Sequence, residues 1–286
     1  MFLLSPGLSW IALFLLPSLA LPFPLQVSSG PASPASTKPP ISWASVAIHP
    51  SNPDRQGNDY SHDQPDGITE RGSSLSDIIS EGYNFSVMPF REDEISGLPP
   101  WARTARYDIL ARVDPDDVAE FKKLSNLSMQ DTIAAFTARQ PTGEMLMMQS
   151  LLRDRFALRV HWESKERSVY ALVLAKGGLR MKPAADPKHG EMSFSRGHMS
   201  GKGVPISFLA SLLAMPVSRT VVDRTGVTGS FDFDLRFNPG DDPSGKPSDD
   251  PDFFTAIQEQ LGLKLESTNA SVPVLVVDHV EPPTPN

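Results

Sequence analysis

The sequence predicts an α+β fold in which helices pack on mixed or antiparallel sheet. Short amphipathic segments recur, each followed by two segments with the apolar pattern of strands, with a period of roughly thirty residues. Strands and helices do not alternate at the spacing of nucleotide-binding folds. We therefore expect repeated helix-hairpin (αββ) units over residues 41–283.

The first part of this body contains a looser copy of the pattern. Residues 41–48 form a lone leading strand, and a helix begins near Ser74 with Leu75, Ile78, Ile79 and Tyr83 at helical spacing. A long loop that contains Trp101 then leads to a strand at residues 106–113. Residues 129–138 predict a further helix.

The clearest unit begins at Thr142, a residue type that caps helix N-termini. Met145, Met148 and Leu152 lie on one face of the predicted helix. Two strands follow at residues 158–163 and 169–175, and we expect a turn between them.

Two more units follow the same pattern. Pro205 suits the first turn of a helix that buries Ile206, Leu209, Leu212 and Leu213, before strands at 217–223 and 230–237. In the last unit Asp250 is the expected N-cap, Gly262 ends the helix, and strands cover 263–267 and 273–280. Its predicted apolar stripe is Phe254, Ile257 and Leu261.

Composition and charge exclude several classes. The chain has 286 residues, of which 40% are hydrophobic, and this lies outside the range of disordered proteins. A formal net charge of -8 without a basic stripe argues against nucleic-acid binding. The chain contains no cysteine, so neither disulfides nor a lipid-modified cysteine contribute to its stability or attachment.

The N-terminal residues predict export. Residues 8–20 are apolar and end in Ser18-Leu19-Ala20, which suits a signal peptide (1–20) cleaved after Ala20. No Lys or Arg precedes the apolar run, so an uncleaved membrane anchor stays open as an alternative. Residues 21–40 form a Pro/Ser-rich linker, and 284–286 a tail. We expect a periplasmic or secreted bacterial protein. Within the body at 41–283, residues 180–200 are a candidate boundary between two subdomains.

Polar residues that alternate with apolar ones are the first candidates for chemistry. His161 and Glu163 would share the outward face of a strand, where they could exchange a proton or line a partner surface. Asp232 and Asp234 also share one face, but the buried pattern of Phe231, Phe233, Leu235 and Phe237 explains them as solvated residues. The run from Asp223 to Gly229 predicts a turn in which the two glycines adopt positive φ and Asp223 accepts from backbone amides.

The loop around Trp101 is the other candidate surface. Trp101 and Arg103 have the composition of interaction hot spots, although a tryptophan that covers a sheet edge fits equally well. No nucleophile elbow, phosphate loop or metal-binding histidine spacing is present, so we expect no cofactor, metal site or catalytic residue of a recognisable motif.

Several stretches together carry a resemblance to a known family. EMLMMQSLLRDRFALRV, VVDRTGVTGSFDFDLRF and FFTAIQEQLGLKLES resemble a family of exported proteins from soil bacteria of the acidobacterial type, classed as a domain of unknown function. The similarity runs from about residue 41 to 283 and takes in ISGLPPWARTARYDILARV. It implies an extracytoplasmic location, with some relatives attached to a membrane-bound metallopeptidase sensor. The chain departs from the family in a longer segment between residues 114 and 141.

The resemblance assigns no catalytic residue to this chain. The helix-hairpin pattern is also similar to short N-terminal modules of secretins, which bind peptides or proteins. We therefore expect a non-enzymatic binding or sensing module for a peptide or protein partner. Two alternatives stay open: an extracytoplasmic hydrolase with a dispersed Asp/Glu/His site, and a structural surface protein.

Overall fold

A computed structural model describes residues 39–52, 54, 57, 59–61, 64–86, 89–240 and 249–283. The predicted signal peptide, nearly all of the predicted linker and the tail lie outside these residues. All described residues belong to one unit that begins at Pro31. Within it, no helix has the length and apolar content that crossing a bilayer requires.

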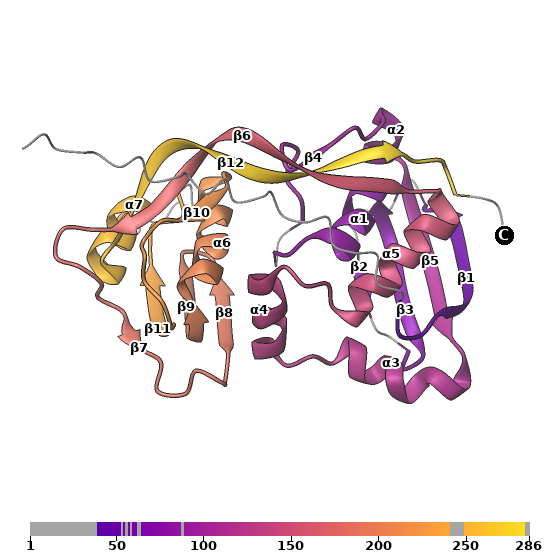
Figure 1. Ribbon diagram of the computed structural model, residues 1–286, viewed down its shortest axis with the longest axis horizontal. Coiled ribbons are helices and arrows are strands. Elements are labelled where there is room, and N and C mark those ends of the chain that lie inside the picture. Colours follow the sequence, from indigo (N-terminus) through magenta and orange to yellow (C-terminus); the bar gives the residue numbers. More distant parts are fainter. Residues whose placement is uncertain are drawn as a thin grey trace, which may run out of the picture. The chain divides into compact units, whose positions relative to one another are not determined.

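Three sheets contain the described strands (Figure 1). The first is antiparallel, in the order β1 (Trp43–Pro50), β5 (Arg106–Val113), β3 (Gly67–Ser74) and β2 (Asp59–Ser61). The second is mixed, in the order β10 (Val221–Asp223), β6 (Arg159–Leu174), β12 (Leu263–His279) and β4 (Ile95–Ser96). The third is antiparallel, in the order β7 (Lys182–Pro183), β11 (Ser230–Arg236), β9 (His198–Pro205) and β8 (Glu191–Ser195).

The helices are distributed between these strands. They are α1 (Leu75–Tyr83), α2 (Pro100–Thr104), α3 (Val118–Ser125), α4 (Met129–Ala138), α5 (Gly143–Phe156), α6 (Ile206–Val217) and α7 (Phe253–Ala256). A 3-10 turn (Pro115–Asp117) precedes α3, and a π-helical turn (Ile257–Leu261) continues α7. The α+β class is confirmed.

Local signals predicted most helices correctly. The Thr142 hydroxyl accepts a hydrogen bond from the Met145 amide at 3.2 Å and caps α5. Pro205 was expected in the first turn of α6 and is instead its N-cap, one residue before that turn. Gly262 ends the last helical segment with φ of 70°. The expected strands at 41–48 and 106–113 correspond to β1 and β5.

The start of the last helix was predicted wrongly. Asp252, not Asp250, is the N-cap, because its carboxylate accepts from the amides of Phe254 and Thr255 at 3.0 and 3.1 Å. The helix therefore begins two residues later than expected. Its buried face contains Phe253, whereas Phe254 is 46% exposed.

The predicted hairpins are wrong. Residues 158–163 and 169–175 belong to the single strand β6, and residues 263–267 and 273–280 to the single strand β12. The two pair with each other from Leu174–Leu263 to Arg159–His279. In the remaining unit, β10 pairs with β6 while β11 pairs with β9, so these two strands form no hairpin either.

We call the antiparallel pair of β6 and β12 the β6–β12 ribbon. The residues in its middle explain why hairpins were predicted. Polar residues such as Ser164, Ser168 and Asn269 occupy it, and a polar interruption between apolar segments is typical of a turn. Here it marks the stretch where the ribbon passes from one hydrophobic core to another and neither strand face is deeply buried.

Each end of the ribbon packs on a different core. Leu172, Leu263 and Leu265 join the first core, which α6, α7 and the third sheet complete. Leu275 and Val277 join the second core, which contains α1, α5 and the first sheet. In Figure 1, β6 and β12 run side by side over both sets of elements.

Candidate ligand-binding pocket

A pocket of about 410 Å³ lies where the middle of the β6–β12 ribbon meets the C-terminal end of α6 and the segment after α1. Apolar and aromatic side chains supply most of its wall, and two arginines and one glutamate supply its charge. Its described lining residues are Asn84, Phe85, Ser86, Pro89, Phe90, Arg91, Glu94, Arg139, Trp162, Ser211, Ala214, Met215, Ser218, Thr220, Val221, Val222, Val272 and Pro273.

Arg139 is the central charged residue of this pocket. It ends α4 in the left-handed conformation, with φ of 51°, and its amide donates to the carbonyls of Ala135 and Phe136. Its guanidinium carbon lies over the rings of both Phe85 and Trp162, at 5.1 Å from each ring centroid. Contact with aromatic faces stabilises the cation. The two rings have no oxygen that could accept a hydrogen bond from its N–H groups.

The donors of Arg139 remain available for a ligand. No described residue accepts a hydrogen bond from its guanidinium, although an arginine carries five N–H donors. Burial lowers the pKa of Arg139, and the attraction of Glu94 partly opposes this effect. Although the residue as a whole is exposed, its charged end is therefore partly desolvated. The pocket holds a cation that keeps its charge but lacks an anionic partner in contact.

The second arginine, Arg91, is already paired with a carboxylate, although its buried Nε makes no hydrogen bond with a described residue. Its amide and its Nη2 donate to the two carboxylate oxygens of Glu94 at 2.9 and 2.7 Å, and Nη2 also donates to the Thr220 hydroxyl. Burial raises the pKa of Glu94, while the hydrogen bonds and charge of Arg91 lower it. This pair ties the segment before β4 to the start of β10.

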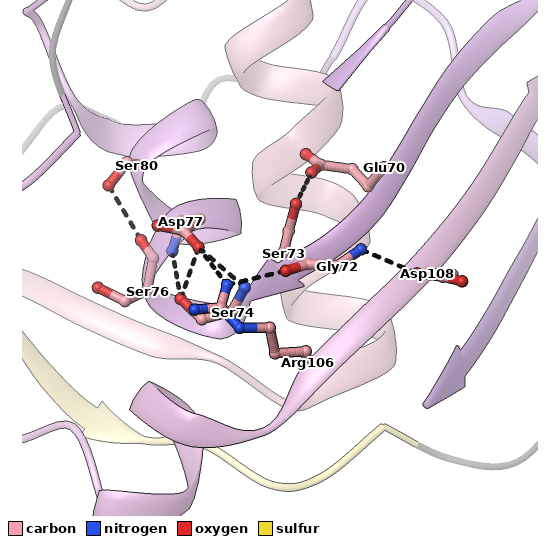
Figure 2. Close-up of polar contacts among 9 residues, drawn as sticks. All are labelled: Glu70, Gly72, Ser73, Ser74, Ser76, Asp77, Ser80, Arg106 and Asp108. Atoms are coloured by element: carbon pink, nitrogen blue, oxygen red, sulfur yellow. Dashed lines mark hydrogen bonds and ion pairs between the residues drawn. The ribbon is translucent and has the colours of Figure 1, made fainter. Parts of the chain in front are cut away.

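Hydrogen bonds around α1 position the aromatic wall. Ser74 caps α1, and the Ser80 hydroxyl donates to the Ser76 carbonyl at 2.9 Å (Figure 2). The same hydroxyl accepts from the amide of Phe90 at 3.0 Å. Because Phe90 packs against Trp162, with ring centroids 6.2 Å apart, α1 holds one side of the pocket in place.

A polar network at the start of α1 connects it to the first sheet. Asp77 accepts from the Ser74 amide and lies 3.7 Å from the Arg106 guanidinium (Figure 2). Arg106 donates to the Gly72 carbonyl, and the Gly72 amide donates to Asp108, both at 2.8 Å. These contacts fix β3, α1 and β5 to one another, which is a structural role.

Comparison with known proteins identifies the family. The sequence matches the DUF3738 family, described as a protein of unknown function, over residues 76–280. The chain belongs to the DUF3738 family. No curated protein and no solved structure matches it. The matched region contains α1 from its second residue, all of the ribbon and every described residue that lines the pocket.

His161 and Glu163 lie close together in the DUF3738 chain, but outside this pocket. His161 Nε2 is 3.1 Å from Glu163 Oε1, and its Nδ1 is 2.9 Å from a carboxylate oxygen of Asp278 on β12. The hydrogen bonds of Asp278 and Glu163 raise the pKa of His161, and His161 lowers the pKa of Glu163. All three side chains are exposed, and the intervening Trp162 lines the pocket.

Asp232 and Asp234 lie on the third sheet, where the four apolar residues between and beside them are buried as predicted. Asp232 accepts from the Gly203 amide at 3.0 Å, and Asp234 lies 2.8 Å from His198. Both line an open, mixed-charge pocket of about 560 Å³. Among the described residues, no group of three or more His, Asp or Glu is arranged to hold a metal ion.

The turn at residues 223–229 has the predicted geometry. Gly226 and Gly229 have φ of 67° and 98°, and the Thr225 amide donates to Asp223 at 2.9 Å. These contacts explain the sequence of the turn without a ligand.

Trp101 and Arg103 do not lie in a bare loop. They belong to the short helix α2, and Trp101 is partly buried against the second core. Neither lines the pocket around Arg139. Their role as a partner surface stays a prediction.

Sequence reasoning missed Phe85, Arg91, Glu94, Arg139 and Trp162. These residues come from three separate stretches, and no spacing rule joins them. The alternation around His161 does place Trp162 on the inward face. That was the one available signal, and it is equally typical of a core residue.

Proposed function

We propose that this chain is an exported, non-enzymatic binding or sensing module, and that the pocket around Arg139 receives part of a peptide or protein partner. One observation carries the proposal. Arg139 keeps a partly desolvated guanidinium against two aromatic rings, with no described acceptor for its donors. The N–H donors of this exposed residue are left to water, and a ligand carboxylate can replace that water with stronger, charge-assisted hydrogen bonds. Export rests on the apolar run at residues 8–20.

The size and lining of the pocket support recognition of a small group. Its volume of about 410 Å³ lies within the range of ligand sites, and its wall combines apolar side chains with a few polar groups that can fix orientation. Aromatic residues and arginine are also the types that dominate binding energy at protein interfaces.

A hydrolase is the competing function, because Glu94 in the pocket has a raised pKa, as general acids do. However, Arg91 holds both of its carboxylate oxygens, and Glu94 is the one carboxylate among the described lining residues. A paired acid and base is therefore lacking within this lining. Cleavage of a bound peptide that Glu94→Gln abolishes would favour the hydrolase.

A pocket-filling variant tests the binding proposal. Met215 is 37% exposed and lines the pocket, so Met215→Trp should fill it without disturbing a core. Leu174→Trp is the matched control, because Leu174 is 43% exposed on β6 and lies outside the lining. Peptides selected on the intact chain from a random display library should bind Leu174→Trp normally.

The same peptides should bind Met215→Trp at least about tenfold more weakly in a fluorescence anisotropy titration, as expected when a central contact is blocked. Equal binding to both variants would exclude this pocket as the site. Loss of binding in Trp101→Ala instead would locate the partner surface on α2.

A further inference from the structure

We infer that the ligand of the Arg139 pocket carries a single carboxylate on an apolar body. This inference rests on the binding function proposed above and names the chemistry of the group that the pocket takes. The C-terminal residue of a peptide and a free organic acid share this chemistry.

The arrangement of Arg139 favours a planar anion. Its guanidinium lies over the faces of Phe85 and Trp162, and its N–H donors lie in the guanidinium plane. A carboxylate has two oxygens in one plane and can accept two parallel hydrogen bonds from such a fork. A carboxylate that reaches Arg139 in the plane of its guanidinium can therefore accept two hydrogen bonds from it.

The charges of the pocket favour one negative charge over two. The described lining contains two cations and one anion, and Arg91 is paired with Glu94. Among the described lining residues, Arg139 is thus the one cation without an anionic partner in contact, and a monoanion neutralises it. A dianion such as a phosphate monoester would add a second charge near Glu94, whose field already acts on Arg139.

The rest of the wall favours an apolar body. Val221 and Val222 of β10, Val272 and Pro273 of β12, and Met215 of α6 contribute apolar surface to the pocket. Burying a hydrophobic side chain against them removes apolar area from water on both partners. Hydrophobic amino acids and small aromatic acids both match this wall and its volume of about 410 Å³.

Calorimetric titration of the full chain with matched probes tests the inference. The probes are N-acetyl-phenylalanine, its C-terminal amide, acetyl-Ala-Ala-Phe as acid and as amide, and phenyl phosphate. We expect each acid to bind at least about tenfold more tightly than its amide, since the amide lacks the charge that Arg139 recognises. A tripeptide acid that binds more tightly than the single residue indicates a peptide C-terminus, and equal affinity indicates a free acid.

Two arginine variants make the test specific. Arg139→Lys keeps the charge but loses the fork and most of the ring contact, so it should reduce the preference for acid over amide to about threefold or less. Arg219→Lys is the matched control, because Arg219 lies 4.7 Å over the Tyr170 ring but does not line the pocket. It should keep the full preference.

Three results would overturn the inference: amides that bind as tightly as acids, phenyl phosphate that binds more tightly than the acids, or no saturation by either acid at about 10 mM, a concentration well above a weak Kd. If the amides bind equally and Met215→Trp still blocks the selected peptides, the binding function stands and the carboxylate assignment fails. If Met215→Trp has no effect on those peptides, the proposed function itself fails.

Discussion

Ser74 shows how one side chain sets the start of an element that reaches the pocket. Its hydroxyl accepts from the Asp77 amide at 3.2 Å, while the Asp77 carboxylate accepts from the Ser74 amide at 2.9 Å, which makes a capping box (Figure 2). The helix that follows leads directly to Asn84 and Phe85 in the pocket wall.

Ser74→Ala should lower the free energy of unfolding by about 1 kcal/mol, because it removes the cap of α1. Urea unfolding followed by circular dichroism measures the change. Ser76→Ala is the matched control within the same helix, since the Ser76 side chain makes no hydrogen bond among the described contacts. It should change stability by less than about 0.5 kcal/mol. Equal losses in both variants would contradict the assigned role of the cap.

His161 gives the exposed face of the ribbon a pH dependence. Its pKa is raised above 6.5 by Asp278 and then by Glu163. A group whose folded pKa is raised stabilises the fold below its unfolded pKa, and this contribution is lost as the pH rises through the folded pKa. An NMR titration of the His161 ring should therefore show a midpoint above 6.5.

Asp278→Asn should lower that midpoint more than Glu163→Gln, because Asp278 has the larger effect on His161. Glu166→Gln is a control on the same strand and should leave the midpoint unchanged, since Glu166 is not among the groups that act on His161. A midpoint at 6.5 in the unaltered protein would show that the two carboxylates do not contact the ring in solution.

The helices and the long strands differ in how far sequence predicts them. Thr142, Ser74 and Gly262 act within a few residues of themselves, so their signals predict the ends of helices correctly. The partners of β6 and β12 lie far away in sequence, and polarity in their middle was mistaken for a turn. Arg139 and Trp162 were not predicted as pocket residues for the same reason, because only the tertiary arrangement brings them together.

A cross-strand disulfide tests the ribbon directly. Ser168 and Asn269 are paired in the register of β6 and β12 and are both exposed, and the chain has no cysteine of its own. Ser168→Cys with Asn269→Cys should oxidise to an intramolecular disulfide, because paired residues of antiparallel strands bring their Cβ atoms within bonding range. Mass spectrometry after alkylation measures it.

The control combines Ser168→Cys with Thr268→Cys, whose side chain points to the other face of the ribbon. It should stay reduced under the same conditions. If β6 and β12 were two separate hairpins, residue 168 would lie in a turn far from residue 269. Ser168→Cys with Asn269→Cys would then stay reduced.

At the scale of the whole molecule, β12 connects the two hydrophobic cores. Leu263 and Leu265 belong to the first core, and Leu275 and Val277 to the second. Removing residues 263–286 should leave both cores open and the chain without a cooperative thermal transition. Each of these side chains contributes about 1.5–3 kcal/mol, and a domain has only about 5–15 kcal/mol in total.

Differential scanning calorimetry checks this expectation. Removal of residues 284–286 is the control, because it leaves every described residue in place. A cooperative transition in the shorter chain would mean that one core folds without the ribbon.

The pairing of β6 with β12 also decides when the protein can fold. During synthesis β6 emerges well before β12, and the helix α6, the third sheet and α7 all lie between them in the chain. Because β12 contributes residues to both cores, neither core is complete before this strand has been made. Such late completion suits a polypeptide that passes through a translocation channel as an extended thread, the route that the proposed signal peptide would open.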